Sequence, residues 1–424
     1  MIARRHVFLI IGYAPIAVET QHLWFKRSFE KFGRLWGARG RVCDLIRDGE
    51  GKGAHWVIET EGPNWKVETT YEPLAWDDII HSDVSRPLWS QVAGTVSVFL
   101  EYLWSGTLWR YFRARWTYGM FFLLPFFHLA LFAAAGLLAA WGVTQWLAPG
   151  GAARWLSFAA ITLAVFAAGL YWPGRRWHTQ HILVDWIFSR DFARNRRPDM
   201  TARLEIFAER IGERVRANTA DEVVVVGHCL GAGLAAYALS RALDRDPELA
   251  RRGPKLCFLT IGATLPKFSL HPKGEHIRRA AQRVAAEPGI AWAEYHSRED
   301  AISFYKFDPV RHVRQTDRTD KKPFIRRVRI KDMVESHTWK RIRFRFLRVH
   351  LQSFLANEKR TPYDYFMFVC GPIPFADAIA APGGPTSFIG ADGSYSPTAS
   401  ATPVAAKGAL TPDDGDVVRE EEML

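Results

Sequence analysis

The segment 223–240 reads VVVVGHCLGAGLAAYALS and restricts the possible folds of this chain more than any other. Its four consecutive valines are typical of a central strand that is buried on both faces of a parallel sheet. Gly227, Gly231 and Gly233 flank a tight turn, and the residues that follow are good helix formers with helical spacing. The segment therefore predicts a buried strand, a sharp turn that carries Cys229 and a helix.

The turn GHCLGAG resembles the nucleophile elbow GHSLGG of lipases and esterases in the α/β-hydrolase family, with Cys229 in the serine position. Dienelactone hydrolases, a branch of that fold, also carry a cysteine there. The resemblance covers residues 5–40 and 200–371 and implies a doubly wound, mostly parallel α/β sheet with Cys229 as nucleophile. The dipole of the following helix would favour the thiolate. The alternative is a buried structural cysteine after an ordinary strand.

The resemblance also implies an acid, placed after a later strand, that orients a catalytic histidine. The predicted strand at 291–295 leads into the sequence HSREDAI, which resembles the acid-bearing loop of lipases. Asp300 in this loop is the candidate, with Glu299 and Asp308 as rivals. A solvated loop carboxylate is the alternative for each of them.

The catalytic histidine should lie beyond the last predicted strand, at 324–330. His350 is favoured over His337 because its segment FLRVHLQSF loosely resembles the His-x-x-Tyr pattern of lipases, with Ser353 in place of the tyrosine. A structural histidine on a helix face is the alternative for both. His228, next to Cys229 in sequence, is expected to point away from the nucleophile.

Two backbone N–H groups would form the oxyanion hole that the resemblance implies. In lipases an early strand ends in His-Gly, and an N–H just beyond it is one donor. Here the sequence Ile-Gly-Tyr at 11–13 takes that place, so Tyr13 would be this donor and the usual histidine is absent. The N–H of Leu230, directly after Cys229, would be the second donor.

Two apolar segments separate the parts that resemble a hydrolase. Residues 119–147 contain no charged side chain and are long enough to cross a bilayer, and 156–172 has about the minimum crossing length. Arginines flank the pair at 110–115 and 175–176, which by the positive-inside rule places both flanks in the cytoplasm. The sequence therefore predicts a transmembrane hairpin, with a buried helical hairpin of a soluble core as the alternative.

The composition limits the cellular compartments in which this chain is expected to act and the partners that it is expected to bind. Lysine and arginine exceed the acids by 12, and the excess is clustered, but no recognised nucleic-acid motif accompanies it. Next to apolar spans, such clusters indicate an anionic membrane surface rather than nucleic acid. The four cysteines show no metal-type spacing, which suits free thiols in a reducing compartment and implies neither metal nor cofactor. The apolar run at 7–11 is too short for a signal peptide.

These observations divide the chain into residues 1–115 and 174–374 of one α/β-hydrolase-like domain, a transmembrane hairpin at 116–173 and a disordered tail at 375–424. They predict an inner-membrane protein with cytoplasmic termini that cleaves or transfers a lipid-like ester or thioester through Cys229, His350 and Asp300. Membrane lipids and an acyl substrate are its expected partners. An inactive, membrane-tethered scaffold is the alternative, favoured by the cysteine and the missing His-Gly pair. A transporter subunit is disfavoured because the spans lack paired charges.

Overall fold

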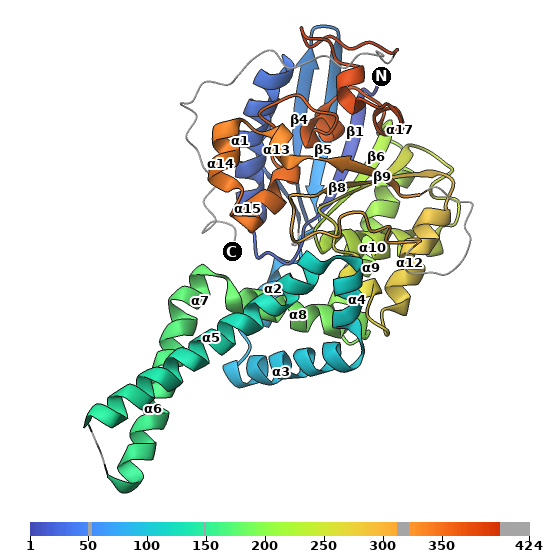
Figure 1. Cartoon of the computed structure of the whole chain (residues 1–424). Helices are drawn as coiled ribbons and strands as arrows, with labels where there is room; N and C mark the ends of the chain where they lie inside the picture. The colour runs from blue at the N-terminus through green and yellow to red at the C-terminus, as the bar shows by residue number, and fades with distance from the viewer. Residues whose placement is uncertain (50–52, 148–149, 312–321, 399–424) are drawn as a thin grey trace. The chain divides into compact units, whose positions relative to one another are not determined.

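A computed structural model describes residues 1–49, 53–147, 150–311 and 322–398 (Figure 1). The chain forms two compact units, one built from Met1–His81 and the residues from Asp191 onward, the other from Ser82–Arg190. The first unit contains the sheet and the second consists of helices. The second unit is larger than the hairpin predicted at 116–173, because helices before and after the apolar segments pack with them.

The sheet of the first unit has the order β2-β4-β5-β1-β6-β7-β8-β9, with β3 paired to β4. The strands β5, β1, β6, β7, β8 and β9 run parallel to one another, whereas β2, β3 and β5 are antiparallel to β4. This confirms the predicted α/β class with a mostly parallel sheet. The strands are β1 (Arg4–Ile10), β2 (Arg39–Val42), β3 (Ile46–Asp48), β4 (Gly53–Gly62), β5 (Trp65–Pro73), β6 (Glu222–His228), β7 (Lys255–Ile261), β8 (Ile290–Ser297) and β9 (Phe324–Val328).

Strands β1 and β6 lie at the centre of the sheet because they are apolar on both faces. In β6 every residue is buried, and Leu9 of β1 pairs with Val226 in register. The six neighbouring parallel strands end at one edge, the edge where ligands and catalytic groups gather in open α/β sheets.

Helices cover both faces of the sheet (Figure 1). Helix α10 packs against β1 and β6 on one face, while α1 and α16 bury aromatic side chains such as Phe25 and Phe366 against the other. The helical elements of this unit are α1 (Val18–Trp36), α9 (Pro198–Ala217), α10 (Gly231–Arg245), α11 (Pro266–Ser269), α12 (Glu275–Ala286), α13 (Ile330–Met333), α14 (Ser336–Ile342), α15 (Phe346–Leu351), η2 (Gln352–Phe354), α16 (Tyr365–Cys370), α17 (Phe375–Ala380) and η3 (Gly384–Ser387).

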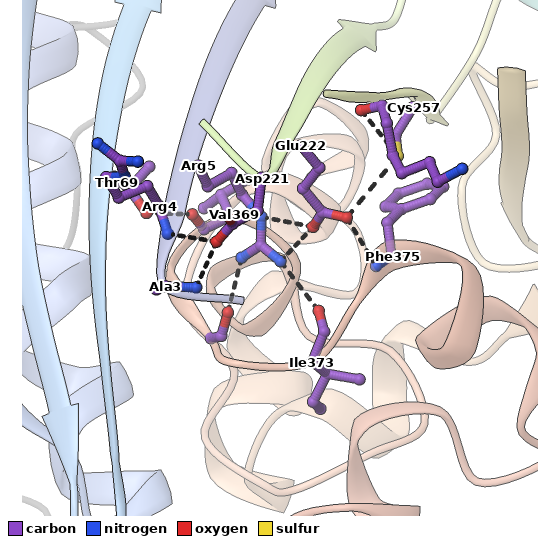
Figure 2. A network of polar contacts seen from close by, with 12 residues as sticks. Ala3, Arg4, Arg5, Thr69, Asp221, Glu222, Cys257, Val369, Ile373 and Phe375 are labelled. Carbon is purple, nitrogen blue, oxygen red and sulfur yellow. Dashed lines mark hydrogen bonds and ion pairs between the residues drawn. The ribbon is translucent and has the colours of Figure 1, made fainter. Parts of the chain in front are cut away.

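The segment after α16 is folded, which corrects the tail predicted from residue 375. Figure 2 shows the network that holds it: Arg5 of β1 donates to the carbonyls of Gly371 and Ile373, at 2.7 and 2.9 Å. Glu222 of β6, paired with Arg5, accepts the N–H of Phe375 at 3.1 Å. Both charges are buried, so each needs the other and these backbone groups. The remaining predicted tail, 399–424, lies outside the described residues.

The second unit packs around aromatic rings contributed by its helices. Trp186 contacts the rings of Tyr102, Tyr111, Tyr118 and Phe122. The helices here are α2 (Asp77–Val84) and α8 (Thr179–Ala193), which connect it to the first unit, and α3 (Leu88–Trp104), α4 (Thr107–Ala114), α5 (Trp116–Leu147), α6 (Gly151–Tyr171) and α7 (Pro173–Arg176).

Helices α5 and α6 lie side by side as a hairpin (Figure 1). Gly136 marks their close approach, since a Cβ there would lie 2.7 Å from the carbonyl oxygen of Thr162. By length and composition Trp116–Leu147 and Gly151–Arg176 could each cross a membrane. Few residues of the first apolar window are buried in the protein, and none of the second.

Candidate active site

Cys229 occupies a sharp turn between β6 and α10, at the end of the central strand. Its backbone φ is 55°, in the left-handed region that a non-glycine residue rarely adopts and that is concentrated at functional sites. Its N–H donates to the carbonyl of Ile261 at 3.1 Å, and its carbonyl accepts the N–H groups of Ala232 and Thr264, at 3.2 and 3.0 Å. These bonds hold the strained residue in place, and Cys229 remains partly accessible as a free thiol.

The glycines on both sides of Cys229 are needed for close backbone contacts. A Cβ on Gly231 would lie 2.0 Å from the carbonyl oxygen of Ile10, and one on Gly227 would lie 2.5 Å from the Cα of Ala232. Both distances are far below van der Waals contact, so a larger residue would open the turn. The glycine spacing read from the sequence therefore has a direct steric cause.

His350 and Asp300 form a buried pair at the same edge of the sheet. His350 Nδ1 lies 2.8 Å from Asp300 Oδ2, and the side chains are 5 and 3% exposed. Asp300 follows β8 and also accepts the N–H of Ile302 at 3.0 Å, whereas His350 lies on α15, beyond β9. Two residues 50 positions apart in the chain are thus brought together as an acid–histidine pair.

The charges of this pair shift both pKa values. Burial by itself would raise the pKa of Asp300, but the charge and hydrogen bond of His350 and the Ile302 N–H together lower it. Burial would lower the pKa of His350, but the charges of Asp300 and Cys229 raise it well above its usual value. Asp300 is therefore held as a carboxylate, and the imidazolium form of His350 is stabilised beside the sulfur.

The second ring nitrogen of His350, Nε2, is buried and makes no hydrogen bond of ordinary geometry to any described residue. Cys229 is nevertheless close enough to raise the pKa of the ring. Catalytic hydrogen bonds are often long in the absence of substrate and shorten when it binds. The arrangement therefore allows a proton to pass between Cys229 and His350.

His228 packs against His350, a contact that the sequence did not predict. The centroids of the two imidazole rings are 4.8 Å apart. The ring of Phe354 stacks on that of His228, with centroids 5.5 Å apart. Burial, reinforced by the charge of His350, lowers the pKa of His228 to about 3. His228 is therefore neutral and packs against the charged imidazole of His350. The sequence placed it only next to Cys229, whereas its contact partner lies more than a hundred residues away.

The end of β1 reaches the turn at the position expected for an oxyanion hole. A Cβ on Gly12 would lie 3.1 Å from Cys229 Sγ and 3.4 Å from the Leu230 nitrogen. No acceptor among the described residues receives the Leu230 N–H. Tyr13 follows Gly12 and packs its ring on Trp76, with centroids 5.7 Å apart. Gly12 therefore brings the segment that carries Tyr13 next to the turn that carries Cys229 and Leu230.

The rival site residues have other surroundings. His337 is exposed, with Thr338 Oγ1 3.3 Å from its Nε2. Glu299 accepts the Ser297 hydroxyl at 2.7 Å, and Asp308 accepts the backbone N–H groups of the loop that follows it. In the described part of the chain, Asp300 is the one carboxylate of the three that contacts His350.

Gly262, just after β7, makes room for the His350–Asp300 pair and offers a test of it. Its φ is +53°, and a Cβ there would lie 2.8 Å from His350 Cε1 and 3.4 Å from Asp300 Oδ2. Gly262→Ala should displace the imidazole. If Cys229 is a nucleophile served by this pair, its acylation should slow by about 100-fold, since small misplacements of catalytic groups have effects of this size. Burst kinetics with an activated ester would measure the rate.

Gly253→Ala is the matched control, because Gly253 has a similarly left-handed φ of +74° but borders Val215 and Asn218. Both substitutions introduce comparable backbone strain, so both should lower the midpoint of thermal unfolding. Equal acylation rates in the two variants would show that Gly262 serves the backbone alone and that the pair does not need its space.

No group of three or more histidine, cysteine or acidic side chains in the described residues could hold a metal ion. No protein-family model, curated protein or solved structure matches the chain. Function is therefore inferred from the geometry of this site and from the residues that build it.

Proposed function

We propose that this chain is a membrane-anchored acyl-transfer enzyme of α/β-hydrolase type that acts on an ester or thioester through Cys229, His350 and Asp300. One observation carries the proposal: a partly accessible cysteine with a left-handed φ, on a strand–turn–helix, beside a buried histidine–carboxylate pair. Neither a structural cysteine nor a structural ion pair needs this combination. Nucleophilic catalysis uses these parts, because the nucleophile needs a base and the base needs an orienting group.

In the proposed reaction the sulfur of Cys229 attacks the carbonyl carbon of the substrate. The thiol proton passes to His350 Nε2, while Asp300 holds the ring through Nδ1 and stabilises its positive charge. The N–H groups of Leu230 and Tyr13 would stabilise the oxyanion, and each donor of this kind contributes about 3 kcal/mol to catalysis in related enzymes. His350 then protonates the leaving alcohol or thiol, and water or another acceptor releases the acyl group from the sulfur.

Helices α5 and α6 would anchor the enzyme in the membrane. The chain leaves the sheet after β5 and returns to it at β6, so it must cross a bilayer an even number of times between them. A two-helix hairpin satisfies this condition. The flanking arginines, such as Arg113 and Arg175, favour the cytoplasm for both flanks. A membrane anchor suits an acyl substrate with lipid character.

Trapping of an acyl-enzyme tests the proposal. The protein purified in detergent would be mixed with p-nitrophenyl esters from butyrate to palmitate, and the digested product examined by mass spectrometry. We expect a burst of p-nitrophenol and an acyl group on Cys229. Cys43, a half-buried free thiol remote from the site in sequence, is the internal control for nonspecific acylation. Equal acylation of both cysteines, or none at any chain length, would favour the inactive scaffold.

A further inference from the structure

Helix α3 presents a row of apolar side chains to its surroundings and buries two polar side chains. Its exposed face consists of residues that recur every three or four positions, with exposures between 43 and 81%: Trp89, Val92, Val96, Leu100, Leu103 and Trp104. Gln91 and Thr95 on the opposite face are 8 and 7% exposed. A surface helix of a soluble protein shows the reverse pattern. This exposed face therefore needs an apolar environment.

The side-chain amide of Gln91 on the inner face is satisfied within the second unit. Gln91 Nε2 donates to the carbonyls of Val84 and Arg86, at 3.1 and 2.8 Å, and Gln91 Oε1 accepts from Gln180 at 2.9 Å. These bonds fix the rotation of α3 about its axis. The helix cannot turn its apolar face inward without breaking them.

Helix α3 also packs along the first third of α5. The rings of Phe99 and Phe126 are 4.9 Å apart, and those of Tyr102 and Phe122 are 5.1 Å apart. Phe126 lies ten residues from the start of α5, about 15 Å along its axis at 1.5 Å per residue. If α5 spans the bilayer, this contact lies between the headgroups and the middle of the hydrocarbon core.

Chain topology excludes α3 as a third crossing of the membrane. Strands β5 and β6 belong to one sheet, so the crossings between them are even in number. The turn after α3 leads directly into α4, which carries exposed Trp109 and Arg113. Tryptophan and arginine are typical of the headgroup level.

We infer that α3 is an interfacial membrane helix, whose face from Trp89 to Trp104 is immersed among the outer acyl chains of the leaflet in which α5 begins. The inference rests on the proposed anchoring by α5 and α6. Trp89 and Trp104, near the two ends of the face, would hold the helix parallel to the surface. A lipid bilayer is the occupant that fits, because only Glu101 in this helix is charged and Phe99 packs against α5, the first helix of the proposed anchor.

Depth measurement with a fluorophore tests the inference. Single cysteines would be introduced by Val96→Cys or Leu100→Cys in a Cys43→Ser, Cys229→Ala background, whose remaining cysteines are buried, and labelled with an environment-sensitive dye. The full chain would be reconstituted into phosphatidylcholine–phosphatidylglycerol vesicles. We expect lipids with a spin label on the acyl chain to quench both dyes several-fold, and aqueous iodide to leave them unquenched.

Two matched positions separate this inference from the anchoring itself. Leu163→Cys, at an exposed position of α6, should be quenched by the spin-labelled lipid, and Leu23→Cys, at an exposed position of α1 in the first unit, only by iodide. Lipid quenching at 163 with iodide quenching at 96 and 100 would overturn the inference and leave the anchor intact. Protection of 96 and 100 from both quenchers would also overturn it, because a protein surface would then cover the face.

Discussion

Replacement of Cys229 by alanine is expected to abolish the acyl-enzyme and to lower ester turnover by about 10⁶-fold, the loss that removal of the nucleophile causes in a serine protease. The residual rate would come from the oxyanion donors and from substrate binding. Steady-state and single-turnover assays with p-nitrophenyl esters measure both quantities. The fold should persist, because alanine fills most of the space of a cysteine that is only partly buried.

Two further variants make this result specific. Cys43→Ala removes the other partly accessible thiol and should leave turnover unchanged. Cys229→Ser should retain a slower, base-dependent reaction, because its hydroxyl is far less acidic than a thiol. Activity present in the serine variant but absent in the natural protein would contradict the proposal and identify a fold that has lost its chemistry.

Replacement of Asp300 by asparagine is expected to slow acylation about 10⁴-fold, because an amide leaves the imidazole in the wrong tautomer and removes the charge that stabilises it. Glu299→Gln and Asp308→Asn are the matched controls, as both carboxylates bond to other groups in the acid-bearing loop and beyond it. Each should change the rate by no more than a few-fold. A loss confined to one of these controls would assign the orienting role to that residue.

The pH profile of Asp300→Asn gives a second readout of the same change. The charge of Asp300 raises the pKa of His350, which favours the protonated ring and keeps it protonated at higher pH. Removal of that charge lowers the pKa of His350, so the limb of the acylation profile that follows the ionisation of this ring should move to lower pH. A variant that merely disturbed packing would lower the rate without moving this limb.

The local features of the site were accessible from the sequence, because short-range chemistry determines them. Consecutive valines require a buried strand, and the glycines around Cys229 permit a turn that no larger residue could form. The pairing of Asp300 with His350 was anticipated from the resemblance to lipases and is found at 2.8 Å. Their catalytic roles remain predictions.

Features that depend on distant partners were not accessible in this way. The contact of His228 with His350 arises only when α15 folds over the end of β6. Composition indicated a disordered tail from Phe375, but the buried Arg5–Glu222 pair gives that backbone its hydrogen-bond partners. The size of the helical unit depends on aromatic contacts such as Tyr102 with Trp186, which no single helix reveals.

The position of β1 between β5 and β6 has a consequence for biosynthesis. One edge of β1 is covered as soon as β5 has been made, but its other partner, β6, is separated from β5 by the whole helical unit. At 5–20 residues per second the ribosome needs about 7–30 s to make the roughly 150 residues between them. Throughout that interval β1 presents an unpaired edge, the form in which strands most readily aggregate. A membrane-inserted hairpin would hold the nascent chain apart from its neighbours during this delay.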